Sequence, residues 1–275
     1  MYTPKEVAEN YLSICRAKAA LPLGRMFLLA CMAGAFVALA GVASTAAAAT
    51  VGDPSLAKLI SGCVFPAGLA MVIVAGSELF TGNNLMIMGV LSRVISVRQM
   101  LRNWCVVYLG NFVGAALVAA LCVLGHVFSA FDGRLAQSVV TIAQAKASLS
   151  FGDAFFRGIL CNFLVCIAVW MASAARSVPG KIIAVFFPIM TFVVAGFEHS
   201  VANMYYLMAG FKMRKWVLKI EIYPFKYSNL NGYHSSTIGR IRQQMLFCFV
   251  ERYQFHSPFL DKMPVICELT MPSKN

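Results

Sequence analysis

Charged residues are scarce in this sequence. Asp, Glu, Lys and Arg make up 12% of the 275 residues, against about 25% in a soluble globular domain. Acidic residues are the scarcer class, with 11 Asp and Glu against 23 Lys and Arg, while hydrophobic residues reach 60% and the mean hydropathy is +0.74. This composition excludes an ordinary water-soluble enzyme. The basic residues stand in short patches between long apolar runs, which is typical of a membrane protein rather than of a nucleic-acid-binding one.

Two further features are absent. None of the nine cysteines forms a C-x-x-C motif, so neither a zinc site nor a redox pair is indicated, and we expect no metal and no cofactor. A cleaved signal peptide is also a poor explanation for the start of the chain. Residues 1–24 are polar and amphipathic, and the apolar run after them is too long for a signal peptide. We expect residues 1–24 to form an amphipathic helix along the membrane face, because Val7, Tyr11 and Ile14 recur at helical spacing.

Five apolar segments are long enough, at about 20 residues, to cross a bilayer. They lie at about Met26–Thr50, Leu59–Leu91, Trp104–Phe131, Ala154–Ala174 and Ile182–Leu207. The second and fifth are interrupted by polar residues and glycine. The sequence therefore predicts an all-α membrane protein.

The basic residues of the short loops predict the orientation. Four of them, Lys58, Arg134, Lys146 and Arg157, fall on one side of the predicted spans. Nine fall on the other side, which places the N-terminus in the cytoplasm: Lys5, Arg16, Lys18, Arg25, Arg93, Arg98, Arg102, Arg176 and Lys181. Five spans leave the basic segment after residue 210 on the side opposite the N-terminus, against this rule.

The two interrupted segments share a motif. Each has an F-P pair, at 65–66 and at 187–188, followed by V-A-G-x-E-x-x-x-x-N at 74–83 and at 194–203. The distance between F-P and V-A-G is two residues shorter in the second copy, so the register is not identical. The copies enter the membrane from opposite sides, because an odd number of spans precedes one and an even number the other. This indicates an inverted repeat, in which discontinuous helices line a pathway at mid-membrane.

A glycine and a carboxylate occur at the same place in each copy. We expect Gly76 and Gly196 to supply the backbone freedom for the helix breaks. A carboxylate in apolar sequence is unfavourable unless it is satisfied. Because both copies carry the same residue, we interpret Glu78 and Glu198 as structural clamps that accept hydrogen bonds from backbone N–H groups freed by the break. The same structural role is predicted for the asparagines that end the motifs, Asn83 and Asn203.

His199 stands where the first copy has Leu79. A single buried histidine is more often a satisfied core residue than a working one. This histidine, however, lies in a predicted helix break at membrane depth, where a neutral imidazole can donate to a small anion or share a proton with it. We therefore predict that His199 faces the pathway.

The segments A-G-S-E-L-F-T-G-N at 75–83 and G-F-E-H-S-V-A-N-M at 196–204 resemble the two signature segments of the formate/nitrite transporter family. The resemblance covers about residues 1–209. It implies an aquaporin-like inverted repeat of six transmembrane helices with broken second and fifth helices. It further implies a homopentamer in the bacterial cytoplasmic (inner) membrane, with one pore in each subunit.

The resemblance also implies roles for individual residues. Thr81, Asn162 and His199 match the polar residues of the family's pore, and Lys146 matches the basic residue of its outer vestibule. The hydrophobic constrictions are matched by Leu69 and Phe192, with Phe65 beside them, on the outer side, and by Leu79, Phe80 and Val165 on the inner side. Without the resemblance, these apolar residues read as packing residues and Lys146 as an ordinary loop charge.

The resemblance implies transport of a small monovalent anion such as formate or nitrite. An anion is far less stable than its neutral acid in a narrow apolar constriction, so we expect the substrate to cross at least one gate protonated, or sharing a proton with His199. Hydrosulfide or another small anion is an alternative substrate. A hydrolase built on Ser200 and His199 is disfavoured, because neighbouring residues of a helix point in different directions, and we expect no enzymatic activity.

Residues 210–275 are predicted to differ from the membrane domain at 1–209. Their charged fraction is 14 of 66 residues against 20 of 209, and they contain no spanning run, so five of the family's six helices are expected. An altered reading frame would explain this tail, and a native extramembrane domain is the alternative. A truncated, non-transporting membrane fragment is therefore the second functional hypothesis. The expected partners are small anions, protons, membrane lipid and further copies of the chain, without nucleic acid.

Overall fold

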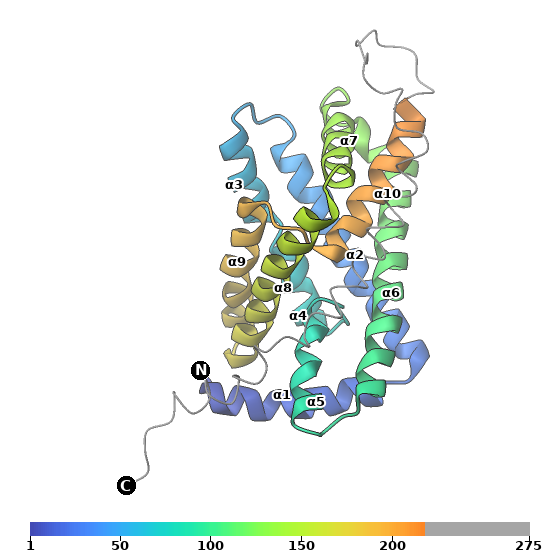
Figure 1. Cartoon of the computed structure of the whole chain (residues 1–275). Coiled ribbons are helices and arrows are strands. Elements are labelled where there is room, and N and C mark those ends of the chain that lie inside the picture. Colours follow the sequence, from blue (N-terminus) through green and yellow to red (C-terminus); the bar gives the residue numbers. More distant parts are fainter. Residues whose placement is uncertain (218–275) are drawn as a thin grey trace.

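The structure is a computed structural model that describes the fold of residues 1–217 and the side chains of residues 1–211. In this part of the chain every regular element is a helix (Figure 1). The predicted tail lies outside the described residues from residue 218 onward. The preceding residues, 210–217, belong to the last helix, α10 (Ser200–Val217).

Five helical segments of the described chain are long and apolar enough to cross a membrane, which confirms the predicted all-α membrane fold. The predicted bounds lie within three residues of the observed ones at Met26–Thr50 and Ala154–Ala174, whereas the helix predicted at Trp104–Phe131 begins and ends seven residues earlier. The segments are α2 (Leu23–Ala48), α3 with α4 (Pro54–Val64 and Ala67–Ala75), α6 (Val97–Leu124), α8 (Phe151–Ala174) and α9 (Val178–Ala195).

Both interrupted segments are broken, as predicted. After α4 the chain continues through the 3-10 turn η1 (Gly82–Met86) into α5 (Ile87–Leu91), and after α9 it continues into α10. In Figure 1 the path α3–α4–α5 descends through the molecule, whereas α9–α10 ascends. The two F-P pairs differ, because Pro66 separates α3 from α4, whereas Pro188 lies inside α9.

Two amphipathic helices lie at opposite ends of the bundle (Figure 1). The predicted N-terminal helix is α1 (Pro4–Ala20), which starts at a capping box and buries Val7, Tyr11, Cys15 and Ala19. The other is α7 (Arg134–Ala147), preceded by the short 3-10 turn η2 (Val127–Ser129). The sequence reasoning missed α7, although Leu135, Val139 and Ala143, all buried, recur every four residues. We call the two ends of the molecule the α1 end and the α7 end.

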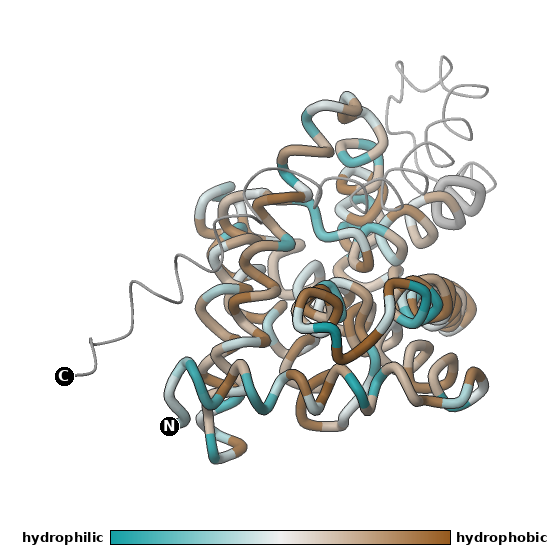
Figure 2. The backbone as a smooth tube through the Cα atoms, turned by 60° about the horizontal axis from the view of Figure 1, so that its bottom comes forward, coloured by the Kyte–Doolittle hydropathy of each residue, from teal (hydrophilic) through white to brown (hydrophobic). Residues whose placement is uncertain are grey.

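The outer surface of the bundle is apolar. Figure 2 shows hydrophobic residues along most of the helices and hydrophilic ones on α1 and several connections. Large side chains such as Leu117, Phe156 and Phe163 are 57%, 66% and 63% exposed, which no water-soluble monomer would sustain in one band. This surface fits membrane lipid.

Close contact between α2 and α6 depends on small residues, as it does in many membrane proteins, where lipid tails remove the hydrophobic drive for helix association. A side chain at Gly114 would overlap the backbone carbonyl of Cys31, and one at Gly34 would overlap the backbone of Asn111. Gly110 is a further point of close contact, since a Cβ there would lie 2.9 Å from the carbonyl oxygen of Phe27.

We predict that Gly114→Leu separates α2 from α6 and prevents stable folding in detergent, because the clash is with backbone and cannot be relieved by a rotamer change. Overpacking of this kind costs about 1–3 kcal/mol or more. Thermal unfolding followed by size-exclusion fluorescence measures the effect. Gly24→Ala in α2 is the control, since nothing lies within 4 Å of its Cβ position, and equal stability of the two variants would contradict the packing argument.

Candidate functional site

The first break begins where α4 ends at Gly76, which has a left-handed backbone with φ of +73°. Free backbone groups of the break are paired with neighbours. The N–H of Ser77 donates to the Val72 carbonyl at 3.0 Å, and the N–H of Glu78 donates to the Leu29 carbonyl at 3.2 Å. The break is therefore a fixed structure rather than a loose loop, as buried backbone at membrane depth requires.

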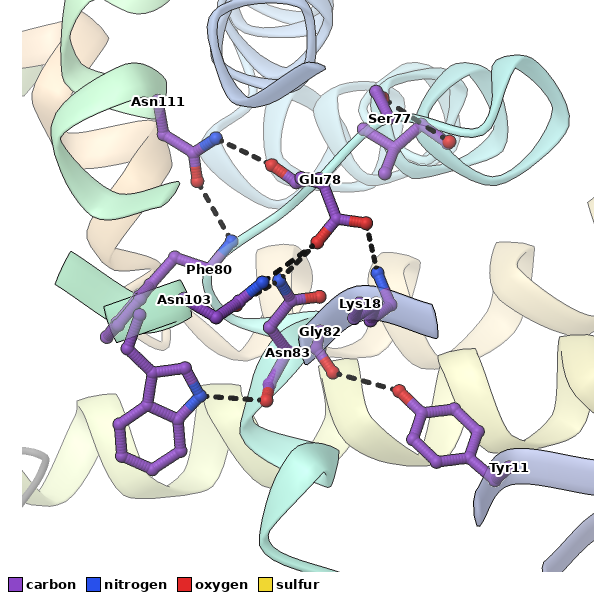
Figure 3. Close-up of polar contacts among 11 residues, drawn as sticks. Tyr11, Lys18, Ser77, Glu78, Phe80, Gly82, Asn83, Asn103 and Asn111 are labelled. Carbon is purple, nitrogen blue, oxygen red and sulfur yellow. Dashed lines mark hydrogen bonds and ion pairs between the residues drawn. The ribbon is translucent and has the colours of Figure 1, made fainter. Parts of the chain in front are cut away.

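One side chain of α6 joins three elements at this break (Figure 3). The Asn111 carbonyl oxygen accepts from the Phe80 N–H at 2.9 Å. Its amide nitrogen donates to the Ala30 carbonyl at 2.8 Å and to the Glu78 carbonyl at 2.9 Å. Asn111 is fully buried and was not singled out from the sequence, although a polar residue in the middle of an apolar span is itself a signal.

The carboxylate of Glu78 accepts hydrogen bonds from side chains, and not from backbone N–H groups as we expected. Lys18 of α1 lies 2.6 Å from one carboxylate oxygen, and Asn83 donates to the other at 2.7 Å (Figure 3). Asn103 of α6 approaches that second oxygen at 3.5 Å. The Trp104 indole N–H donates to the Asn83 carbonyl at 2.9 Å. Lys18 thus compensates the buried charge and two amides hold the carboxylate in place, which makes Glu78 a clamp with donors other than the expected ones.

The second break repeats this arrangement. Gly196 has a φ of +74°, and the Glu198 carboxylate accepts from Lys146 of α7 at 2.7 Å and from Asn203 at 2.8 Å. Each break therefore holds a Lys–Glu–Asn triad whose lysine comes from the amphipathic helix at one end, α1 or α7. Lys146 is bound to Glu198 and lies 5.4 Å from the centre of the Tyr206 ring.

The two breaks meet at His199 and Thr81. The His199 Nε2 lies 3.1 Å from the Thr81 hydroxyl oxygen, and its Nδ1 accepts the Ala202 backbone N–H at 3.0 Å. A nitrogen that accepts a backbone N–H carries no proton, so this network assigns the imidazole proton to Nε2. His199 thereby caps the first turn of α10 and donates to Thr81 from the other break.

Apolar rings cover one side of the imidazole. The ring of Phe192 stacks on His199 with centroids 5.5 Å apart, and Phe65 meets Phe192 edge-on at 5.8 Å. Leu69, like these rings, is buried. Of the expected outer constriction, Phe192 thus contacts the predicted pore histidine, and Phe65 contacts Phe192.

The residues expected at the inner constriction are also buried. Leu79 is 4% and Val165 0% exposed. Phe80 packs edge-on against Trp104 and Tyr108 of α6, at 6.3 and 5.1 Å between ring centres. By these contacts Phe80 is a packing residue, in addition to its predicted place at the inner constriction.

Asn162 of α8 is connected to Thr81 by contacts with a cysteine one turn later in the same helix. Its amide nitrogen is 3.8 Å from the sulfur of Cys166, which is 3.8 Å from the Thr81 carbonyl oxygen. The Asn162 carbonyl oxygen is buried and has no hydrogen-bond partner in the described structure. The sequence reasoning missed Cys166, for which only its place one turn after Asn162 gave a signal.

Comparison with known proteins identifies a family for this chain. The profile of the family described as "Formate/nitrite transporter" matches residues 5–238, which extends past the boundary predicted at residue 209.

Among relatives, "Formate channel FocA" of Haemophilus influenzae is 40% identical over 215 residues, with 76% of each chain covered. "Probable formate transporter" of Methanothermobacter thermautotrophicus is 38% identical over 227 residues, covering 76% of this chain and 82% of the relative.

Solved structures of two channels have the same fold. An "FNT family ion channel" has a TM-score of 0.73 with 30% identity, covering 98% of both chains. A "Pentameric formate channel with formate bound" has a TM-score of 0.68 with 28% identity, covering 90% of this chain and 98% of that one. With the two motifs in order, both helix breaks present and the family profile matched over residues 5–238 of its 275, this chain belongs to the formate/nitrite transporter family.

Proposed function

We propose that this chain transports a small monovalent anion, with formate as the first candidate. The observation that carries the proposal is the contact between His199 and Thr81, which joins the two helix breaks beside buried apolar rings. A hydrogen-bond donor among apolar side chains suits a small acceptor such as an anion. The names of the relatives support formate, and nitrite and hydrosulfide are the alternatives that share its size and charge.

The hydrogen-bond network supports a mechanism in which His199 acts as a neutral donor. Because Nδ1 is occupied by the Ala202 N–H, the imidazole offers its single proton from Nε2. When Thr81 accepts this proton in a hydrogen bond, the threonine hydroxyl is left to donate to the substrate, and the amide of Asn162 is a further donor nearby. Between these donors the anion is stabilised. At the edge-on rings of Phe65 and Phe192 the neutral acid passes more easily than the anion. The substrate therefore takes up a proton from the water before it crosses this gate, and the hydrogen bonds of His199 and Thr81 hold the anion until then.

Assembly and orientation belong to the same proposal. The apolar, exposed faces of the bundle and the pentameric structural relative support a homopentamer with one pathway in each subunit. The basic residues of the loops support a cytoplasmic α1 end, an outward α7 end and a place in the bacterial inner membrane.

We predict that His199→Phe lowers the rate of proton-coupled uptake at least tenfold. The phenyl ring keeps the stacking on Phe192 but cannot donate a hydrogen bond to Thr81. Uptake of labelled formate into vesicles that contain the purified chain, at several pH values, measures this. His126→Asn is the control, since His126 is exposed and lies outside both breaks. Unchanged pH-dependent uptake in the His199 variant would refute the mechanism.

Thr81→Val is expected to reduce uptake by about tenfold, since a net hydrogen bond contributes about 0.5–1.5 kcal/mol and valine keeps the shape of threonine. Thr191→Val is the matched control, because the Thr191 hydroxyl donates to the Phe187 carbonyl within α9 and is exposed. The same vesicle assay applies. If the wild-type chain moves neither formate nor nitrite, the chain is a non-transporting fragment instead.

Native mass spectrometry of the purified chain is expected to show five copies. A monomer in mild detergent would contradict the pentamer. The transport assay would then test the transport function independently of assembly.

A further inference from the structure

One face of α8 packs against the first break. Asn162, Cys166 and Val169 are spaced by four and three residues along this helix, so they share a face. The Cys166 sulfur lies 3.8 Å from the carbonyl oxygen of Thr81. At the next residue of the break, Gly82, a Cβ would lie 3.3 Å from the Cγ2 atom of Val169. The break therefore lies against this face of α8 at two successive residues.

The hydrogen bonds at Cys166 have a defined direction. The carbonyl oxygen of Thr81 is an acceptor only, so the cysteine donates its single S–H proton to it. The sulfur is then left as an acceptor, and the amide nitrogen of Asn162 donates to it at 3.8 Å. If the amide were turned the other way, two acceptors would face each other. The thiol thus assigns the nitrogen and the oxygen of the Asn162 amide, which are otherwise nearly indistinguishable.

In this orientation the amide oxygen of Asn162 is turned away from the sulfur. This oxygen is buried and has no hydrogen-bond partner among the described residues, although buried polar groups are normally paired. A buried acceptor without a donor is unfavourable, and a ligand that brings a donor removes this cost. The side chain therefore offers a place for a hydrogen-bond donor, close to Thr81.

The need for a donor distinguishes the two forms of the substrate. A formate or nitrite ion carries acceptor oxygens only, so it gains nothing from a further acceptor. Its neutral acid carries one O–H group, which donates to a carbonyl oxygen. An unpaired amide oxygen therefore favours the neutral acid, whereas the hydrogen-bonded pair of His199 and Thr81 offers a donor to the anion.

We propose that the amide oxygen Oδ1 of Asn162 accepts the O–H group of the protonated substrate, and that Cys166 is the positioning residue that orients this oxygen. The second N–H of the amide remains available as a donor. The proton stays on the substrate, and Asn162 neither gains nor loses one. This inference rests on the proposed function and adds the group that recognises the neutral acid.

Formamide is the probe for this role, because it has the shape of formic acid and keeps its N–H donors at every pH of the assay. Methyl formate has the same carbonyl group without a donor. Both are tested as inhibitors of labelled formate uptake into vesicles that contain the purified chain. We expect the inhibition constant of formamide to be about three- to tenfold lower than that of methyl formate, the factor that one hydrogen bond supplies. Equal constants, or no inhibition by formamide, would overturn the inference.

Cys166→Ala is expected to remove this preference for formamide, because the amide of Asn162 is then free to turn. Cys166→Ser is expected to keep it, since a hydroxyl donates and accepts as the thiol does. If Cys166 served packing alone, its substitution would change the rate of uptake but not the ratio of the two inhibition constants. An unchanged ratio in Cys166→Ala would therefore contradict the positioning role.

Cys63→Ala is the control, because it makes the same substitution at an exposed cysteine of α3, outside both breaks. Its ratio of inhibition constants is expected to equal that of wild type. The comparison of the two inhibitors on the wild-type chain needs no variant, so it decides the inference even if Cys166→Ala assembles poorly. Absence of formate uptake by the wild-type chain would overturn the proposed function itself.

Discussion

A buried carboxylate held by a lysine and an asparagine fixes each of the two helix breaks. Without its lysine, Glu78 or Glu198 would be an uncompensated charge inside an apolar bundle, which typically destabilises a protein by about 3–5 kcal/mol. With the lysine, the carboxylate orients the asparagine five residues later and thereby the turn between the two half-helices. The position of His199 against Thr81 depends on both breaks being held in this way, since each residue belongs to a different one.

The lysines also explain why two helices outside the membrane-spanning set are part of the fold. α1 and α7 each bring one lysine to one break, from residues that lie 60 and 52 positions earlier in the chain. The two halves of the described chain thus run through the same order: an amphipathic helix, a span, and a span that breaks. They diverge at the position of Leu79 and His199. At the first break Asn111 of α6 accepts the free N–H of Phe80, and at the second the imidazole accepts the N–H of Ala202 instead.

Much of this architecture could be predicted from the sequence. Apolar length predicted the spans, and the repeated glycine and glutamate predicted where two of them break, because those features are local. The partners of the breaks were not predictable in this way. Lys18 looked like one of nine loop charges, Asn111 and Asn103 like isolated polar residues in a span, and Cys166 like a small apolar one. Their roles arise from contacts between elements far apart in the chain, which periodicity does not encode. The helix α7 was missed for a different reason, since the search for long apolar runs passes over a short amphipathic helix.

Three buried side-chain oxygens of α10, on Ser200, Asn203 and Tyr205, have no partner among the described residues. At the first break, Asn103 and Trp104 of α6 pair with the amide nitrogen and the carbonyl of Asn83. Within the described residues, α6 thus supports the asparagine of the first break, whereas the asparagine of the second break, Asn203, donates to Glu198.

Because Nδ1 of His199 accepts the Ala202 N–H, the ring is at once the partner of Thr81 and the N-cap of α10. A second proton on the imidazole would turn that acceptor into a donor facing another donor, at a loss of about 1 kcal/mol for the missing cap. Charging the ring therefore loosens the first turn of α10. The contact with this helix in turn favours the neutral form of the imidazole.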